Sequence, residues 1–454
     1  MFSKVLIANR GEIAVRIIRA CRELGLGTVA VCSEADRSAL HAKIADQTVC
    51  IGPASSRESY LNIPAILSAC QLTGAQAVHP GFGFLSENAV FARNCQKCGI
   101  KFIGPRPEAI ELMGNKARAK KTMQEAGVPV VPGSDGVVAT VEEAENVARE
   151  IGYPIMVKAS AGGGGRGIRL VEKPAAMEHA FVAAREEALK FFGDDSVYIE
   201  KFIVSPRHVE VQVLADERGN VVHLGERDCS LQRRNQKVLE ESPCPVMTPE
   251  LRERMGEAAK AAVRHVGYHN AGTIEFLLDA RGDFYFMEMN TRIQVEHPIT
   301  EMVTGIDLVK NQILIAQGQP LPFSQEDIQL RGHAIECRIN AENPDKDFRP
   351  SPGTIDALLV PGGPGIRVDS AVYAGYTIPP HYDSMIGKVI AYAPTRAEAI
   401  AKMKWALAEF LVSGIDTNID FQLDILRDWN FSAGQYDIAY LGKKLAAQKA
   451  ASGK

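Results

Sequence analysis

Five side chains able to bind charge recur at every second position between residues 288 and 296. They are Glu288, Asn290, Arg292, Gln294 and Glu296, and mostly apolar residues separate them. Because side chains alternate between the two faces of an extended strand, this spacing predicts one polar face about 27 Å long. The apolar run FYFMEMN that leads into the segment favours a buried strand over the alternative, a solvated edge strand. Buried carboxylates and a guanidinium need a metal, an anion or a polar substrate to balance them.

A second carboxylate-bearing stretch lies just upstream. In GTIEFLL, Glu275 is flanked by isoleucine and phenylalanine, so its side chain must point away from the apolar face. Together with Glu288 and Asn290 it offers ligands that suit a hard divalent cation bridging phosphate oxygens. The alternative is a purely structural pair of carboxylates. Residues 226–237 are also highly charged, but alone they fit a solvated loop.

Residues 162–167 read GGGGRG, which formally matches a dinucleotide-binding fingerprint. That fingerprint needs a helix after the glycines, whereas IRLV here predicts a strand. The sequence also lacks a Walker phosphate loop. We therefore expect a hairpin with a glycine-rich tip whose N–H groups can approach phosphate oxygens. A surface hairpin without a ligand is the alternative, but Lys158, in an apolar strand just upstream, calls for an anionic partner.

Composition excludes several classes of protein. The chain has 454 residues, 46% of them hydrophobic, and a net charge of −4. It therefore has no excess of positive charge of the kind that binds nucleic acid or membranes. Nine cysteines do not suggest a disulfide framework, and the single CxxC pair, Cys95 and Cys98, lacks a second pair of zinc ligands. We expect free, buried thiols. Without an evident signal peptide or an apolar run of about 20 residues, we expect a soluble, cytoplasmic protein.

The N-terminal 110 or so residues alternate between strand-like and helix-like stretches. KVLIA, TVAVC and AQAVHP predict strands, with helices over GEIAVRIIRACRELG and around residues 60–70. This rhythm predicts an open parallel sheet with helices on both faces. The loop GFGFLSEN follows the strand that ends near His79, at the edge where such sheets bind ligands. A helix rich in lysine and arginine is expected over residues 115–126.

The remaining sequence predicts three further regions. Residues 130–203 fit a small α/β unit, with the glycine loop joining two strands, and β-rich sequence continues to about residue 300. The Pro/Gly-rich stretch RPSPGTIDALLVPGGPG marks another unit over residues 330–446. The final residues, AAQKAASGK, are expected to be frayed.

Several segments taken together resemble the biotin carboxylase family of the ATP-grasp superfamily. They are HPGFGFLSEN, KASAGGGGRG, EKFI, RDCSLQRRNQK and above all EMNTRIQVEHPITE. The resemblance runs from IANRGEIA at the start to HYDSMIGK near residue 385, and length and ending are similar to the free-standing component of bacterial acetyl-CoA carboxylases. It implies an ATP-grasp fold of α/β and α+β parts. The implied divisions are an N-terminal α/β domain (1–114), an ATP-grasp domain (115–329, with a lid at about 130–203), an α+β C-terminal domain (330–446) and a tail (447–454).

The resemblance implies that ATP lies between a glycine-rich lid and the core, with adenine against a hinge at residues 200–203. The implied ATP-binding residues are Lys116, Lys158, Gly164, Gly165, Glu200, Lys201, Phe202, Ile203, His208, Asn235, Glu275 and Glu288. A pair of Mg²⁺ or Mn²⁺ ions is implied, bridged by Glu275, Glu288 and Asn290.

The same resemblance implies a bicarbonate site and a biotin site. Bicarbonate contacts Lys237, Arg292, Gln294 and the backbone N–H of Val295, and the implied catalytic residues are Arg292, Glu296, Arg338 and Lys237. Glu296 is the implied base, and deprotonated bicarbonate attacks the γ-phosphate to give carboxyphosphate. Biotin contacts Phe82 and Arg338. Released phosphate removes the biotin N1 proton, and Arg338 stabilises the enolate.

Three positions depart from the family pattern. Phe82 stands where Tyr is usual, so a ring can still pack on biotin but any hydroxyl contact is lost. Asn235 replaces the common His and can still donate to a ribose or phosphate oxygen, so we expect altered nucleotide affinity. Asn115 replaces a common Asp beside Lys116 and removes one charge.

The chain carries no evident biotin-attachment site. Residues 401–404, AKMK, resemble the carrier motif only superficially, because they lie in a helical run. The resemblance therefore implies biotin on a separate carrier protein, carboxyltransferase partners and a homodimer. The implied activity is the first half-reaction of acetyl-CoA carboxylase, which leads to malonyl-CoA and fatty acid synthesis.

Other functions stay open on the sequence. The final acceptor could be pyruvate or propionyl-CoA, because biotin is carboxylated identically in each case. A different ATP-grasp ligase would share the nucleotide residues but would not need Arg338 or residues 292–296. A silent nucleotide-binding protein would usually have lost Glu275, Glu288 or Glu296, which this chain keeps.

Overall fold

The computed structural model describes residues 1–160 and 167–451. The chain divides into two compact units. The first comprises residues 1–128, 207–276 and 288–454, and the second comprises residues 129–206 and 277–287. Each unit is described by itself.

The first unit begins with a five-stranded parallel sheet in the order β3-β2-β1-β4-β5. Its strands are β1 (Lys4–Ile7), β2 (Gly27–Cys32), β3 (Gln47–Cys50), β4 (Ala77–His79) and β5 (Lys101–Phe102). Its helices are α1 (Gly11–Glu23), α2 (Leu40–Ile44), α3 (Ile63–Thr73), α4 (Ala89–Lys97), α5 (Pro107–Gly114) and α6 (Lys116–Glu125), with 3₁₀ turns at Glu34–Asp36 and Ser56–Glu58.

Alternate residues of β1 explain why helices cover both faces of this sheet. Val5 and Ile7 belong to a buried cluster with α1, whereas Leu6 packs on the opposite face with residues of α3 and α4. The predicted parallel α/β region is thereby confirmed. The helix expected at residues 60–70 begins later, because the Asn62 side chain accepts a hydrogen bond from the Ala65 N–H and caps it there.

An eight-stranded sheet forms the centre of the first unit, in the order β13-β12-β9-β10-β11-β14-β21-β19. The strands are β9 (Arg207–Ala215), β10 (Val221–Arg233), β11 (Gln236–Ser242), β12 (Asn270–Leu278), β13 (Phe284–Asn290), β14 (His333–Asn340), β19 (Ile366–Ser370) and β21 (Met385–Ala393). β12 and β13 enter this unit with residues 270–276 and 288–290. Antiparallel pairing of β11 with β14 ties the central strands to those that follow residue 330.

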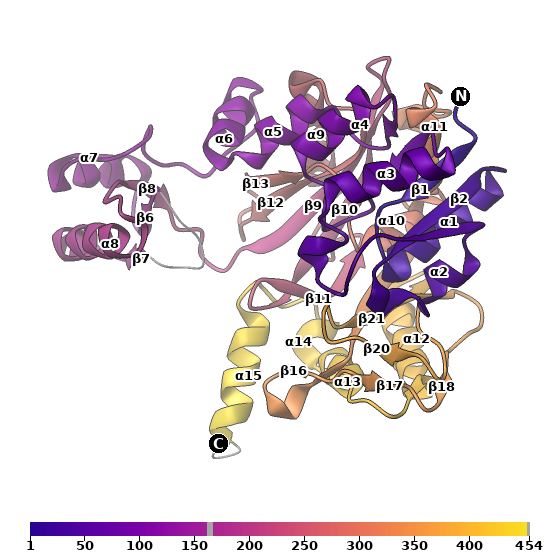
Figure 1. The fold of residues 1–454 in the computed structure, drawn as a ribbon. Coiled ribbons are helices and arrows are strands. Elements are labelled where there is room, and N and C mark those ends of the chain that lie inside the picture. The colour runs from indigo at the N-terminus through magenta and orange to yellow at the C-terminus, as the bar shows by residue number, and fades with distance from the viewer. Residues whose placement is uncertain (161–166, 452–454) are drawn as a thin grey trace. The chain divides into compact units, whose positions relative to one another are not determined.

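The helices of this region are α9 (Pro249–Val266), α10 (His297–Thr304), α11 (Leu308–Ala316), α12 (Arg396–Glu409), α13 (Ile419–Arg427), α14 (Trp429–Ser432) and α15 (Tyr440–Ala451), with 3₁₀ turns at Gln325–Asp327 and Pro344–Lys346. Short strand pairs join β15 (Glu342–Asn343) to β16 (Arg349–Pro350), β17 (Gly353–Thr354) to β20 (Thr377–Ile378), and β18 (Leu358–Leu359) to β22 (Leu411–Val412). Helix α12 packs on β14 and β21 (Figure 1). It contains residues 401–404, which confirms their helical setting.

The second unit is a three-stranded antiparallel sheet with two helices. Its elements are α7 (Val141–Ile151), β6 (Ile155–Ala159), β7 (Ile168–Val171), a 3₁₀ turn (Pro174–Ala176), α8 (Met177–Phe192) and β8 (Val197–Lys201), with strand order β7-β6-β8. Antiparallel pairing of β6 with β7 confirms the predicted hairpin. Gly164 and Gly165 lie outside the described residues.

The predicted strand over residues 288–296 is wrong beyond Asn290. β13 ends there, and Glu296 instead precedes α10 with φ −81° and ψ 11°. The Thr291 N–H, which a continuing ladder would need, donates to the carboxylate of Glu87 at 3.0 Å. The five polar side chains therefore do not share one strand face, and the segment after the strand must be treated as a loop.

Two smaller expectations also need correction. Residues 446–451 are not frayed, because α15 extends to Ala451. All nine cysteines are free, but Cys50 and Cys98 are exposed, not buried. Within the described part of the chain, no helix combines the length and apolar character needed to cross a membrane.

Candidate active site

Lys237 lies at the centre of a buried set of acceptors on neighbouring strands. Its ammonium donates to Glu210 (2.6 Å), Glu275 (3.1 Å), Gln294 (3.4 Å) and Glu296 (2.5 Å). Burial lowers the pKa of Lys237, but surrounding acidic groups raise it well above its ordinary value, so the ammonium stays charged. One cation thus gathers carboxylates from β9, β12 and the loop after β13.

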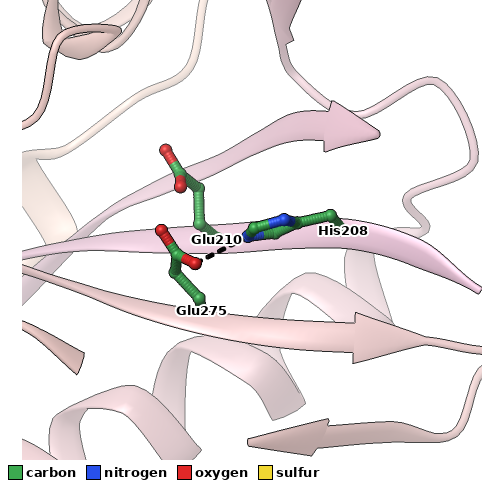
Figure 2. A group of neighbouring side chains, drawn as sticks. All are labelled: His208, Glu210 and Glu275. Carbon is green, nitrogen blue, oxygen red and sulfur yellow. Dashed lines mark ion pairs between the residues drawn. The ribbon is translucent and has the colours of Figure 1, made fainter. Parts of the chain in front are cut away.

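His208, Glu210 and Glu275 form a group that resembles a metal site. Figure 2 shows them on adjacent strands, with the imidazole turned toward Glu275 at 2.9 Å. One ligand atom from each lies within 4.8 Å of the others. Since Lys237 already lies within hydrogen-bond distance of both carboxylates, an ammonium balances their charge in this structure.

Two of the three predicted metal ligands are brought together. The Asn290 amide donates to Glu275 at 2.8 Å, so both residues present oxygen-bearing groups at one point. Glu288 lies 3.7 Å from Lys116, and both side chains are substantially exposed. Burial raises the pKa of Glu275, but Lys237 and His208 bring it well below its ordinary range. An ionised carboxylate beside an amide fits a hard divalent cation.

Glu296 is held between two cations. Its Oε1 accepts from Lys237, and its Oε2 accepts from Arg338 at 2.9 Å. Burial raises the pKa of Glu296, but Lys237, Arg338 and Arg227 lower it by more, so its pKa lies well below the ordinary value. The carboxylate is therefore ionised and able to accept a proton.

Arg338 also contacts Glu240, to which its Nε donates at 2.6 Å. Burial raises the pKa of Glu240 to about 7, against the opposing effect of Arg338. Glu240 lies directly opposite Glu336 across β11 and β14, so two carboxyl groups share one face of the sheet. The Arg338 guanidinium thus links the ionised Glu296 to a carboxyl group that titrates near neutrality.

Arg292 and Gln294 come from the loop that follows β13. Arg292 donates from Nε to Glu87 at 2.9 Å and from Nη2 to Asn290 at 2.9 Å, and its side chain is partly exposed. Gln294 donates to Glu275 at 2.8 Å. Glu87 comes from the loop predicted to lie at the ligand-binding edge of the parallel sheet, and it holds the Arg292 guanidinium in place.

Two of the predicted residues of the second unit contact each other. Lys158 pairs with Glu200 at 2.6 Å across β6 and β8, which supplies the anion that its apolar strand required. Lys201 donates to the carbonyls of Gly152 and Tyr153 at 2.8 and 3.0 Å. Phe202 and Ile203 follow directly after β8. These four consecutive residues, 200–203, form the end of one strand and the start of a connection.

Phe82 and Asn235 both lie in turns. Two backbone carbonyls of the Phe82 loop, those of Pro80 and Phe82, accept from the Asn9 side chain at 2.6 and 2.7 Å. Asn235 (φ 64°) and Arg234 (φ 50°) form the exposed turn between β10 and β11, where both central residues have positive φ. Asparagine tolerates positive φ well, so the conformation of this turn explains why an asparagine fits at position 235.

Sequence reasoning missed one exposed residue near the proposed site, Glu87, and four buried ones: Glu210, Arg227, Glu240 and Lys388. Arg227 is fully buried and donates to Glu210, Gln212, Thr273, Gln294 and Thr300. A signal was available, because residues 208–212 repeat the same two-residue spacing of polar side chains as residues 288–296. Applied to β9, that pattern finds Glu210 beside His208.

Comparison with known proteins finds similar sequences over nearly the whole chain. Family models match at residues 1–110 (biotin carboxylase, N-terminal domain), 115–324 (carbamoyl-phosphate synthase L chain, ATP binding domain) and 336–443 (biotin carboxylase C-terminal domain). Biotin carboxylases of Nostoc sp. and Bacillus subtilis are 59% and 58% identical, covering 97% of this chain and 98% of each relative. A biotin carboxylase crystal structure from Campylobacter jejuni superposes with a TM-score of 0.90 at 52% identity, covering 98% of this chain and 99% of that one.

The fold and the site define an ATP-grasp enzyme, an ATP-dependent ligase. The three matched regions and the full-length relatives identify the family within this class. The chain belongs to the biotin carboxylase family.

Proposed function

We propose that this protein carboxylates biotin carried on a separate protein, using ATP and bicarbonate, as the first half-reaction of acetyl-CoA carboxylase. The observation that carries this proposal is the pair of cations on Glu296. Lys237 and Arg338 flank an ionised, buried carboxylate that lies close to Arg292 and Gln294 in sequence. That set suits an anion that must be held and deprotonated.

Bicarbonate is proposed to bind Lys237, Arg292, Gln294 and the Val295 N–H. The low pKa of Glu296 makes it a weak base while two cations neutralise it. When the bicarbonate anion draws Lys237 toward itself, Glu296 loses part of that stabilisation and its basicity rises. Substrate binding thus prepares the base at the moment when a proton must be removed.

Deprotonated bicarbonate attacks the γ-phosphate to give carboxyphosphate. Its breakdown gives CO₂ and phosphate, and phosphate takes the N1 proton of biotin. Arg338 then turns from Glu240 and Glu296 to the ureido oxygen and stabilises the enolate, whose N1 attacks CO₂ to give carboxybiotin. Phe82 packs on the bicyclic ring. In this scheme Arg292, Glu296, Arg338 and Lys237 are the catalytic residues.

The nucleotide is proposed to contact Lys116, Lys158, Gly164, Gly165, residues 200–203, His208, Asn235, Glu275 and Glu288. Divalent ions held by Glu275, Glu288 and Asn290 would neutralise charge on the phosphate oxygens. A homologous crystal structure is described as a complex with MgADP and bicarbonate, which supports both ligands here. We propose a pair of Mg²⁺ or Mn²⁺ ions per site.

We also propose the domain division 1–114, 115–329 and 330–446, with residues 447–454 as a tail. The partners proposed are a biotin carboxyl carrier protein, carboxyltransferase subunits and a second copy of this chain. The dimer finds support in the same homologue, which is described as a dimer. Nine free cysteines support a reducing compartment, and we place the protein in the cytoplasm.

Pyruvate carboxylation is a second candidate for the complete reaction. A pyruvate carboxylase component of Methanothermobacter thermautotrophicus is 56% identical over 435 residues, covering 96% of this chain and 88% of that protein. Because each acceptor receives the carboxyl group from the same carboxybiotin, the residues above do not separate them. The test is ¹⁴C-bicarbonate transfer with the carrier and carboxyltransferase subunits from the same genome, offered acetyl-CoA, propionyl-CoA or pyruvate. Labelled malonyl-CoA supports the acetyl-CoA assignment, and labelled oxaloacetate contradicts it.

A further inference from the structure

A fully buried lysine outside the proposed catalytic set contacts the backbone of residues 291–296, the loop proposed to bind bicarbonate. Lys388, on β21, has no exposed side-chain surface. Its ammonium donates to the Val295 carbonyl at 2.7 Å and lies 3.0 Å from a carboxylate oxygen of Glu12, in the first turn of α1. A lysine from the C-terminal strands therefore joins an N-terminal helix to the segment that contains Val295 and Glu296.

The register of the sheet places Lys388 beside Arg338. The two residues lie directly opposite each other on β14 and β21, so both side chains emerge on the same face. Arg338 binds the Glu296 carboxylate, and Lys388 binds the carbonyl one residue earlier. Two adjacent cations on one sheet face thus hold two consecutive residues of the loop.

A buried ammonium is costly unless opposite charge and hydrogen bonds compensate for lost hydration. Glu12 supplies the opposite charge. Asp369, the cross-strand neighbour of Lys388 on β19, is instead engaged by Arg367 through two hydrogen bonds of 2.9 and 2.7 Å. Within the described chain, the carboxyl oxygens of Glu336 and Glu12 have no hydrogen-bond partner, and Glu12 faces the ammonium as an ion pair at 3.0 Å. The hydrogen bond from Lys388 to the Val295 carbonyl connects this buried ion pair to the loop of residues 291–296.

We propose that Lys388 is a positioning residue that fixes the peptide between Val295 and Glu296. That peptide leads directly to the side chain proposed as the base. Through the Cα of Val295 it also adjoins the N–H proposed to bind bicarbonate. The inference rests on the proposed function of this loop. Glu12 acts one step further away, by keeping the Lys388 ammonium in place.

Kinetics of Lys388→Met separate this role from a general loss of structure. Methionine is close to lysine in side-chain length, but it has neither the hydrogen-bond donor nor the positive charge. We expect kcat/KM for bicarbonate to fall about 10- to 100-fold, as for a misplaced catalytic group, while KM for ATP stays within about twofold. Lys402→Met is the matched control, because Lys402 also donates to a backbone carbonyl at 2.8 Å, that of Pro364, but lies on α12. Its constants should match the unmodified enzyme. A bicarbonate kcat/KM for Lys388→Met within about twofold of the unmodified enzyme overturns the proposal.

Hydrogen exchange tests whether Lys388 restrains the loop, and it does so without measuring the reaction. Lys388→Met should raise amide exchange over residues 291–298 and leave the N-terminal sheet unchanged. Unchanged exchange over 291–298 contradicts this restraint, whereas a lack of bicarbonate-dependent ATP hydrolysis in the unmodified enzyme contradicts the proposed function instead. Should Lys388→Met fail to fold, Glu12→Gln decides. This variant removes the counter-ion with little change of shape, and it should show the same selective loss for bicarbonate. Normal bicarbonate kinetics with Glu12→Gln would overturn the proposal.

Discussion

Lys237 and Glu296 form a buried ion pair of 2.5 Å, and Lys237 shares its ammonium with Glu210 and Glu275. The same cation therefore holds the proposed base and one proposed metal ligand. Any anion that draws Lys237 away changes the charge balance at both places together. We take this shared lysine as the link between bicarbonate binding and proton removal.

Replacing the proposed base should abolish turnover while preserving the fold. Glu296→Gln removes the proton acceptor and keeps the hydrogen-bonding shape, so bicarbonate-dependent ATP hydrolysis should fall about 10²- to 10⁴-fold. Glu398→Gln is the control, because Glu398 is a carboxylate in the first turn of α12, remote in sequence from the loop. Near-normal hydrolysis by Glu296→Gln would remove the residue from the role of base.

Arg338 should be needed for carboxyl transfer to biotin. Arg338→Ala removes the donor proposed for the enolate, which typically costs about 3–4 kcal/mol, or several hundred-fold in rate. The measurement is biotin-stimulated ATP hydrolysis alongside direct ADP binding. Binding should be retained, since Arg338 contacts Glu240 and Glu296 and no residue proposed for the adenine. Full stimulation by biotin in this variant rules out the enolate role.

Acid stability should depend on Glu241. Its carboxylate accepts from His333 at 2.6 Å, from Arg396 at 2.6 and 2.9 Å, and from the Tyr436 hydroxyl. Burial raises the pKa of Glu241, but hydrogen bonds from His333 and Arg396 bring it down to about 2. A lowered folded-state pKa gives stability that is present above the unfolded value of about 4.5 and is lost as pH falls toward 2.

The matching measurement is urea unfolding of Glu241→Gln between pH 7 and pH 3. The variant should be less stable at pH 7 by about 3 kcal/mol, and the difference should shrink as the pH falls. A difference that is constant over this range contradicts the ionised state of Glu241. Glu398→Gln again serves as the control with an exposed carboxylate on the same helix as Arg396.

Divalent cations should bind more weakly when Glu275 is changed. Glu275→Gln removes a carboxylate that lies beside Asn290, so the Mg²⁺ concentration for half-maximal ATP hydrolysis should rise about tenfold or more. Chelation of divalent ions should stop hydrolysis in the unmodified enzyme. If Glu275→Gln keeps the same Mg²⁺ requirement, the metal lies elsewhere.

Phe82→Tyr should restore a hydroxyl that the family pattern usually has. The Phe82 carbonyl accepts a hydrogen bond from the Asn9 side chain, so we expect the loop backbone to stay in place when the hydroxyl is added. We expect a lower KM for free biotin, with kcat and KM for ATP unchanged. An unaltered KM for biotin means that the ring packs on biotin without using the hydroxyl.

The N-terminal sheet was predictable because its signals are local. The apolar strands and the helix period of α1 are visible in short stretches, whereas the start of α3 was placed too early because the cap at Asn62 was overlooked. The end of β13 was not predictable, because Glu87 stops the ladder from 204 residues away in sequence. The pairing of Arg227 with Glu210 is equally non-local, since each residue alone suggests only a charged strand or loop.

The proposed site residues rest on family resemblance more than on spacing. Spacing singled out Glu275, Glu288 and residues 290–296, but it wrongly assigned residues 288–296 to one strand face. In the structure, Lys237 and Arg227 are the cations that bring acceptors from several elements together: Glu210, Glu275, Gln294 and Glu296. Lys388 lies in the apolar stretch MIGKVIAYA, where a lysine calls for an anionic partner as Lys158 does, but the stretch does not reveal that the lysine contacts Val295.

The first assay to perform is bicarbonate-dependent ATP hydrolysis with Mg²⁺, measured with and without free biotin. We predict hydrolysis that requires bicarbonate and is stimulated by biotin, because holding bicarbonate prepares Glu296 and the proposed biotin site lies next to it at Arg338. Hydrolysis that needs neither bicarbonate nor biotin, or no hydrolysis at all, would contradict the proposed carboxylation of biotin.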